Sequence, residues 1–232
     1  MKQLIVGWRR GGLGYLYQTL KNYGVDVGDT FSQVSSAEEA QTLLGSTKEW
    51  EVSSNIVPFL SELSLPKDLA ITFLLRDPMR VINSIYFLGL LHNEKQTDFH
   101  KLLSGYLNKH KLEKSFADLK GRPGQFACFY TGLWLDIYSN LKHKNKRYVK
   151  VEEFPQILLK HFDLSFADRP AHFFAARTDT NSSLTSYPIT FKDLPENCKQ
   201  AMEKMCRDLG YYKPLWHPRG GHAHYLSPEW HH

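Results

Sequence analysis

A glycine-rich segment with two arginines lies near the start of the chain, at residues 7–15, where the sequence reads GWRRGGLGY. Apolar residues precede it and a helical pattern follows it, so we expect a loop between a strand and a helix. Glycines in such a loop let backbone N–H groups approach an anion, and the dipole of the following helix favours negative charge there. Arg9 and Arg10 add charge-assisted hydrogen bonds. The segment therefore predicts an anion-binding loop.

This loop is not a Walker A sequence, although Gly7 and Gly12 have the Walker A spacing. Leu13 and Gly14 stand where the lysine and the Ser/Thr of that motif belong. The lysine that contacts a γ-phosphate and the hydroxyl that binds magnesium are both absent, which argues against an ordinary ATPase or kinase. A plain tight turn with solvent-facing arginines is the alternative interpretation of the loop.

A second basic position follows another apolar stretch. Residues 69–75 read as a buried strand, and Arg76 comes directly after it. Asp77 is a favourable N-cap and Pro78 a favourable first helical residue, so we expect a helix to begin there. Ser84 lies two turns beyond Asp77 on nearly the same side of that helix. An arginine and a hydroxyl that converge in this way suit a phosphate monoester; the alternative is that Arg76 pairs with a carboxylate and Ser84 packs.

Both motifs require strands that end at a common edge of a sheet. Further strands are predicted at residues 3–7 and 147–151, and helices at residues 13–23, 126–141, 153–161 and 193–209. Strands that alternate with helices predict an α/β fold with three layers, in which helices cover both faces of a mainly parallel sheet. Ligands bind such sheets at the carboxyl ends of the strands. We interpret residues 93–123 as a polar helical or loop insertion and residues 213–232 as a tail.

Length and composition limit the class of protein. The 232 residues carry a formal net charge of +5 and predict a single domain over residues 1–232. No apolar run approaches the roughly 20 residues that a membrane-spanning helix needs, and we expect no signal peptide. The three cysteines fit no metal or redox spacing, which favours reduced thiols in a cytoplasmic protein. The positive charge is compatible with nucleic acid, an acidic membrane surface or a polyanionic small molecule.

The motifs at residues 7–16 and 76–84 match a known pattern in the same order. The first resembles the 5′-phosphosulfate loop of the sulfotransferases, and the second resembles their 3′-phosphate motif. Shorter blocks are similar to the bacterial branch or to the C-terminal stretch of that family: residues 24–28, 50–54, 148–152, 180–182, 191–195 and 209–211. The resemblance spans most of residues 3–212. It implies a P-loop NTPase-like topology and the donor 3′-phosphoadenosine 5′-phosphosulfate (PAPS), released as 3′,5′-adenosine bisphosphate (PAP), without a metal.

The resemblance also implies a role for each matching residue. Arg10 would hold the 5′-phosphosulfate and stabilise charge on the leaving oxygen, and the backbone N–H groups of residues 11–14 would cradle the same group. Arg76 and Ser84 would bind the 3′-phosphate, and Arg219 would contact it from an arginine-glycine segment. The implied cofactor-binding residues are Trp8, Arg9, Arg10, Gly11, Gly12, Leu13, Gly14, Tyr15, Arg76, Ser84 and Arg219.

The loop departs from the pattern of the family at four positions. Arg9 replaces the usual proline, Gly11 replaces a serine, and Leu13 and Gly14 replace residues that carry hydroxyls. Each lost neutral hydrogen bond is worth about 0.5–1.5 kcal/mol. Weaker donor binding, an altered donor and a loss of catalysis are therefore all open.

An in-line transfer of a sulfuryl group also needs a base that takes the proton of the acceptor. Asp29 is the first candidate, because it follows a strand-like stretch and occupies the position where bacterial relatives carry a His-Glu pair. Glu51 is the second catalytic candidate and His92 the third. For each of them the alternative is a solvated or capping residue.

These observations favour a sulfotransferase that acts on a hydroxyl of a carbohydrate or small molecule. One alternative is a nucleotide-binding module that keeps the fold and has lost the chemistry. Another is a basic nucleic-acid-binding protein that uses the lysines of residues 93–123. His217, His222 and His224 lie close together in the sequence, but no carboxylate or cysteine accompanies them at a convincing spacing, so we predict no metal site.

Overall fold

The computed structural model describes the sheet, the helices next to it and the turns that join them. The described residues are 3–7, 10–29, 34–45, 48–87, 104, 107–108, 111, 114, 137, 140–151, 161–162, 189–194 and 196–208. The predicted insertion at residues 93–123 and the predicted helices at residues 126–141 and 153–161 lie mostly outside this set. The tail at residues 213–232 lies entirely outside it.

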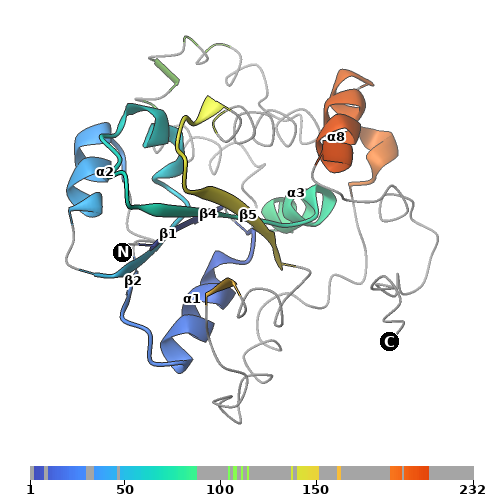
Figure 1. Cartoon of the computed structure of the whole chain (residues 1–232). Coiled ribbons are helices and arrows are strands. Elements are labelled where there is room, and N and C mark those ends of the chain that lie inside the picture. Colours follow the sequence, from blue (N-terminus) through green and yellow to red (C-terminus); the bar gives the residue numbers. More distant parts are fainter. Residues whose placement is uncertain are drawn as a thin grey trace.

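Five parallel strands form one sheet in the order β2-β3-β1-β4-β5 (Figure 1). The strands are β1 (Gln3–Gly7), β2 (Val27–Asp29), β3 (Trp50–Ser53), β4 (Ala70–Leu75) and β5 (Lys146–Lys150). Every residue of β4 is buried, as expected for an apolar strand that is covered on both faces. The predicted α/β class with a parallel sheet is confirmed for this part of the chain.

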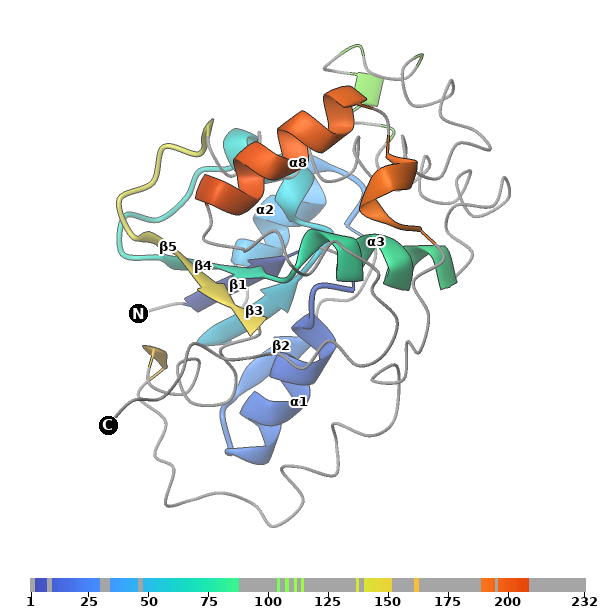
Figure 2. The same ribbon diagram turned by 90° about the vertical axis from the view of Figure 1, so that its right-hand side faces the viewer.

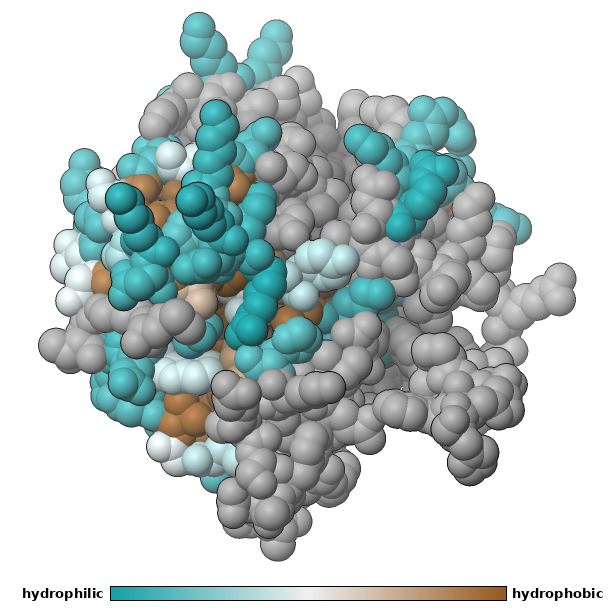
Figure 3. All heavy atoms as spheres, viewed as in Figure 1, coloured by the Kyte–Doolittle hydropathy of each residue, from teal (hydrophilic) through white to brown (hydrophobic). Residues whose placement is uncertain are grey.

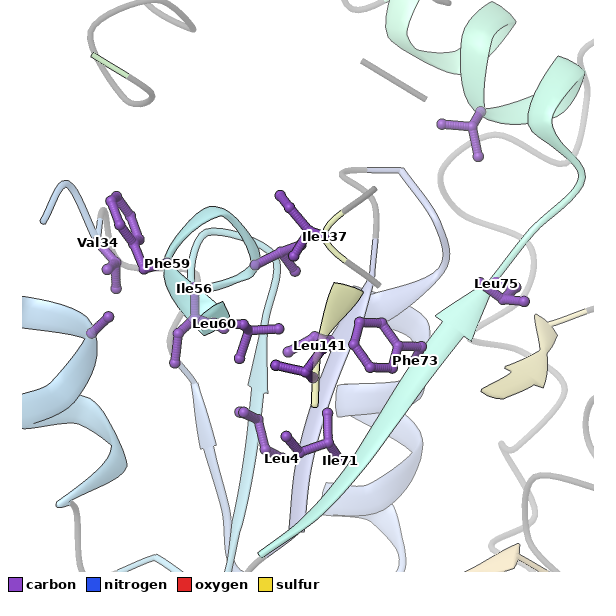
Figure 4. Close-up of a cluster of buried hydrophobic side chains, with 14 of the residues drawn as sticks. Leu4, Val34, Ile56, Phe59, Leu60, Ile71, Phe73, Leu75, Ile137 and Leu141 are labelled. Carbon is purple, nitrogen blue, oxygen red and sulfur yellow. The ribbon is translucent and has the colours of Figure 1, made fainter. Parts of the chain in front are cut away.

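Helices cover both faces of the sheet. On one face α1 (Leu13–Asn22) packs against alternate strand residues such as Ile5 and Val52. On the opposite face α2 (Ala37–Leu44), the 3-10 helix η1 (Val57–Glu62), α3 (Pro78–Phe87) and α8 (Glu196–Asp208) share a second cluster with Leu4 and Phe73. Figure 2 shows α1 on one side of the strands and α2, α3 and α8 on the other, and Figure 4 shows the side chains of the larger cluster. The arrangement has three layers.

The register brings the ends of β1 and β4 to one edge of the sheet. Gly7, the last residue of β1, pairs with Leu74, and β4 ends one residue later. Gly7 suits this close pairing, because a Cβ added to it would lie 2.7 Å from the carbonyl oxygen of Leu74. The chain therefore leaves both strands at the same level, with Arg10 three residues beyond β1 and Arg76 directly after β4.

The start of α3 has the predicted capping. Asp77 precedes the helix, and its Oδ1 atom accepts a hydrogen bond from the backbone N–H of Arg80 at 3.1 Å. Pro78 is the first helical residue, where its missing N–H costs no hydrogen bond. Burial raises the pKa of the Asp77 carboxyl, although nearby N–H groups and arginines act in the opposite direction. Residues 76–78 therefore set the position of α3 relative to the sheet edge.

Some elements differ from the sequence prediction. Neither β3 nor α2 was expected as a regular element. The last predicted helix begins later than expected, at Glu196, because a short 3-10 helix η4 (Phe191–Asp193) with a Thr190–Asp193 capping box occupies the preceding residues. Hydrophilic side chains project from much of the described surface in the view of Figure 3. In the part of the chain that the structure describes, no helix is both long and apolar enough to cross a membrane.

Candidate anion-binding site

The backbone of Arg10 has an unusual conformation for an arginine. Its φ angle is 68°, in the left-handed region, and Gly12 two residues later has a φ angle of 96°. Glycine adopts such angles readily, whereas other L-residues lose about 1–2 kcal/mol there. The turn that joins β1 to α1 is therefore tight and stores strain at Arg10.

Arg10, Arg76 and Ser84 lie together at the carboxyl edge of the sheet. The Nε atom of Arg10 donates a hydrogen bond to Oγ of Ser84 at 2.8 Å. The Nη1 atom of Arg76 donates to the backbone carbonyl oxygen of Arg10 at 2.7 Å. Two elements, the end of β4 and the middle of α3, thus contact Arg10 in the loop after β1.

Two positive charges lie close to each other in this arrangement. Burial lowers the pKa of the Arg10 guanidinium, and repulsion from Arg76 lowers it further. No carboxylate among the described residues offsets this effect at Arg10. A negatively charged group bound at this position would reduce the repulsion, so the electrostatics favour an anion.

The first turn of α1 adds to the positive character of the site. Gly12, the N-cap residue, has no side chain that could cap the helix, and no acidic residue lies in the first turn. The partial positive charge of a helix amino terminus stabilises a nearby anion by about 0.3–1 kcal/mol at an exposed end and by up to about 2 kcal/mol when partly buried. The uncapped helix end and the guanidinium of Arg10 adjoin each other in the chain.

Gly12 holds the loop against the end of β5. A Cβ added to this glycine would lie 2.7 Å from Cγ2 of Val151, the residue after β5. A larger residue at position 12 would therefore displace either the loop or Val151, in addition to straining a backbone that is already left-handed. The sequence indicated that Gly12 is part of the loop, but the contact with Val151 could not be inferred from it.

Several other predicted site residues have their positions defined. Leu13 is buried in the cluster beneath α1, so only its backbone is available to a ligand, while Gly14 is exposed and Tyr15 half-buried. Ser84 is 2% exposed, and its hydroxyl accepts from Arg10. Trp8, Arg9, His92 and Arg219 lie outside the described residues.

Asp29 and Glu51, the two carboxylates proposed as bases, lie in β2 and β3 rather than beside Arg10. Glu51 pairs with Leu4, three residues before the end of β1, and its carboxylate covers Gly28 of β2. Because a strand rises about 3.3 Å per residue, Glu51 lies about 10 Å short of the edge where Arg10 follows. Asp29 is the last residue of β2, and the structure describes its backbone but not its side chain. The structure thus does not bring Glu51 together with Arg10. Asp29 lies one residue nearer the carboxyl edge than Glu51, but β2 is separated from β1 by β3.

Potential metal-ligating side chains are not clustered among the described residues. Within the described ranges, no group of three or more histidine, cysteine, aspartate or glutamate side chains is arranged to hold a metal ion. His217, His222 and His224 lie beyond those ranges, so the predicted lack of a site there stays a prediction.

Comparison with protein-family models, with curated proteins and with solved structures finds no match to this chain.

Proposed function

We propose that this chain binds PAPS at the edge defined by β1 and β4 and transfers its sulfuryl group to a hydroxyl of a carbohydrate or small molecule. The observation that carries the proposal is the convergence of Arg10, Arg76 and Ser84 beside the uncapped start of α1. These are residues to which the resemblance to sulfotransferases assigns contacts with the donor. A P-loop NTPase-like topology belongs to the same proposal.

The strand order supports a ligand at this edge. The strands that follow β1 in the sequence first add on one side, as β2 and β3, and then on the other, as β4 and β5. In open parallel sheets the point at which the order reverses leaves a crevice outside the carboxyl ends of the strands, and ligands bind there. In this sheet the reversal falls at β1, from which the glycine-rich loop extends.

The residues present fit a phosphosulfate group by their chemistry. When bound, PAPS supplies a sulfuryl group that is already attached to a phosphate leaving group. The positive charge of Arg10 would stabilise the charge that develops on the phosphate oxygen as its bond to sulfur breaks, while Arg76 and Ser84 would hold the 3′-phosphate, as the resemblance implies. The N–H groups at the start of α1 bind the same group through their partial charge. The acceptor oxygen forms the new bond to sulfur, and its proton passes to a base, for which Asp29 is our candidate.

The experiment that tests the proposal measures PAP binding by calorimetry. We expect wild-type protein to bind PAP, and Arg10→Ala to weaken binding at least tenfold, because the guanidinium at the loop is lost. Lys67→Ala is the matched control, since it removes one exposed positive charge at the opposite edge of the sheet. Unchanged PAP binding to Arg10→Ala would show that the site is assigned wrongly.

A non-catalytic nucleotide-binding module is the second candidate. It is favoured by the loop itself, because Leu13 points into the core and Gly14 has no side chain, so neither residue supplies the hydroxyl that the family uses. Tight PAP binding with no transfer of sulfate to a broad panel of hydroxyl acceptors would favour this candidate. A cytoplasmic location fits either function, because the cysteine spacings suggest reduced thiols.

A further inference from the structure

Arginine occupies a position in the loop where the backbone conformation would suit glycine. Arg10 and Lys111 are the described non-glycine residues with a positive φ angle. Such a conformation persists only where the surrounding structure holds it, and it is concentrated at functional sites. Arg10 has one contact that fixes its side chain and another that fixes its backbone.

Ser84 holds the side chain of Arg10, and Arg76 holds its backbone. Ser84 accepts from Nε of Arg10, whereas Nη1 of Arg76 donates to the Arg10 carbonyl oxygen at 2.7 Å. A hydrogen bond with a charged donor is among the stronger ones in proteins. Arg76 also follows β4, a fully buried strand, so its main chain starts from a rigid base. The bond forms even though the two guanidinium groups repel each other.

We propose that Arg76 is a positioning residue that holds residue 10 in the left-handed conformation and so fixes the backbone of the anion-binding loop. The inference rests on the proposed function and deepens it. It assigns Arg76 an action through the Arg10 carbonyl, in addition to any effect of its charge on the ligand.

The test compares the effect of Arg76→Ala in two backgrounds, Arg10→Ala and Arg10→Gly. Both backgrounds lack the guanidinium of residue 10, and they differ in how readily that residue adopts a positive φ angle. With alanine at position 10 the loop depends on Arg76, whereas glycine adopts the conformation without help. We expect Arg76→Ala to reduce PAP affinity at least fivefold more in the Arg10→Ala background than in the Arg10→Gly background, measured by calorimetry or NMR titration.

A direct contact between Arg76 and the ligand gives a different result. Arg76→Ala would then reduce PAP affinity by the same factor in both backgrounds, and that outcome would overturn the inference while leaving the proposed function intact. Arg76→Gln serves the same comparison if an alanine variant does not fold. Lys67→Ala, combined with each background, controls for the loss of one positive charge and should change neither affinity.

Hydrogen exchange separates this inference from the proposed function. We expect Arg76→Ala in otherwise wild-type protein to accelerate amide exchange at Leu16 at least tenfold, because its N–H donates to the carbonyl oxygen of Gly12 in the loop, while exchange in β1 and β4 changes little. Unchanged exchange at Leu16 would overturn the inference even if PAP binds. Absence of PAP binding to the wild-type protein would contradict the proposed function, and the exchange result would still decide whether Arg76 fixes the loop.

Discussion

Arg10 combines two features that each cost free energy, a left-handed backbone and a half-buried guanidinium near a second cation. The charge of Arg10 and the glycines around it predict an anion-binding role, which stays a prediction. The backbone conformation of Arg10 could not be predicted, because an arginine disfavours positive φ angles and nothing local in the sequence reveals the hydrogen bond from Arg76. The hydrogen bond from Arg10 to Ser84 could not be predicted either, because the spacing of residues along α3 does not reveal how close α3 lies to the loop.

The strain at Arg10 predicts a difference between two substitutions. Arg10→Gly and Arg10→Ala both remove the bond to Ser84 and the repulsion from Arg76, so these effects cancel in a comparison. We expect Arg10→Gly to be more stable than Arg10→Ala by about 1 kcal/mol, because alanine retains the cost of the positive φ angle. Urea unfolding of the two variants measures the difference. Equal stabilities, or a more stable alanine variant, would contradict the strain.

Because burial raises the pKa of Asp77, we expect the stability of the protein to depend on pH. Burial raises the pKa of its carboxyl in the folded protein, so the contribution of this group is most favourable below its unfolded pKa, about 3.9. That contribution is lost as the pH rises through the folded pKa. Asp77→Asn keeps an oxygen that accepts from the backbone N–H of Arg80, and asparagine caps helices well. We expect this variant to be more stable than wild type at pH 7, with a gap that narrows as the pH falls.

Unfolding by urea at several pH values between 3 and 7 measures this gap. Asp68→Asn is the control, because it changes the same side chain at an exposed position. If instead the wild type gains stability relative to Asp77→Asn as the pH rises from 3 to 7, ionised Asp77 stabilises the fold and the prediction is wrong.

At the scale of the element, the unit formed by β4 and α3 was the most predictable part of the fold. A continuous apolar strand followed by Arg-Asp-Pro defines both the end of the strand and the start of the helix, since each residue there has a separate local preference. By contrast, β3 is only four residues long and includes Glu51, a carboxylate that is 7% exposed. Its burial depends on Gly28 in the neighbouring strand, which no local pattern reveals.

The hydrogen bonds of Asn83 attach α3 to the segment at Ile189, so their loss should lower the free energy of unfolding. Its buried amide donates to the carbonyl oxygens of Met79 and Ile189 and accepts from the backbone N–H of Ile189. We expect Asn83→Ala to destabilise the fold by at least about 2 kcal/mol, because it leaves buried backbone groups of Ile189 without these bonds, at a cost of about 1–3 kcal/mol each. Chemical denaturation checks the value, with Asn22→Ala in a less buried position as the control. A loss below that of the control would contradict the role of Asn83.

At the scale of the whole molecule, the alternation of strands and helices predicted a parallel sheet, but the order of the strands could not be obtained from one sequence. The central position of β1 depends on the separate pairing of Gln3–Gly7 with β3 and with β4. The pairings involve short apolar segments whose sequences fit several partners. The order matters for function, because it determines which strand ends are neighbours and therefore which arginines meet.

A ligand that binds only the folded protein raises the thermal midpoint of the whole chain. At a free PAP concentration 100 times the dissociation constant, the stabilisation is about 2.7 kcal/mol, which corresponds to about 5–10 °C for a chain of this size. Differential scanning fluorimetry with PAP, ATP and NAD measures the shift, and sodium chloride of equal ionic strength controls for screening of the +5 net charge. We expect the shift with PAP alone, and a smaller one in Arg10→Ala. Equal shifts with all three nucleotides, or with salt, would mean that positive charge in general, rather than a site built on Arg10, attracts the anion.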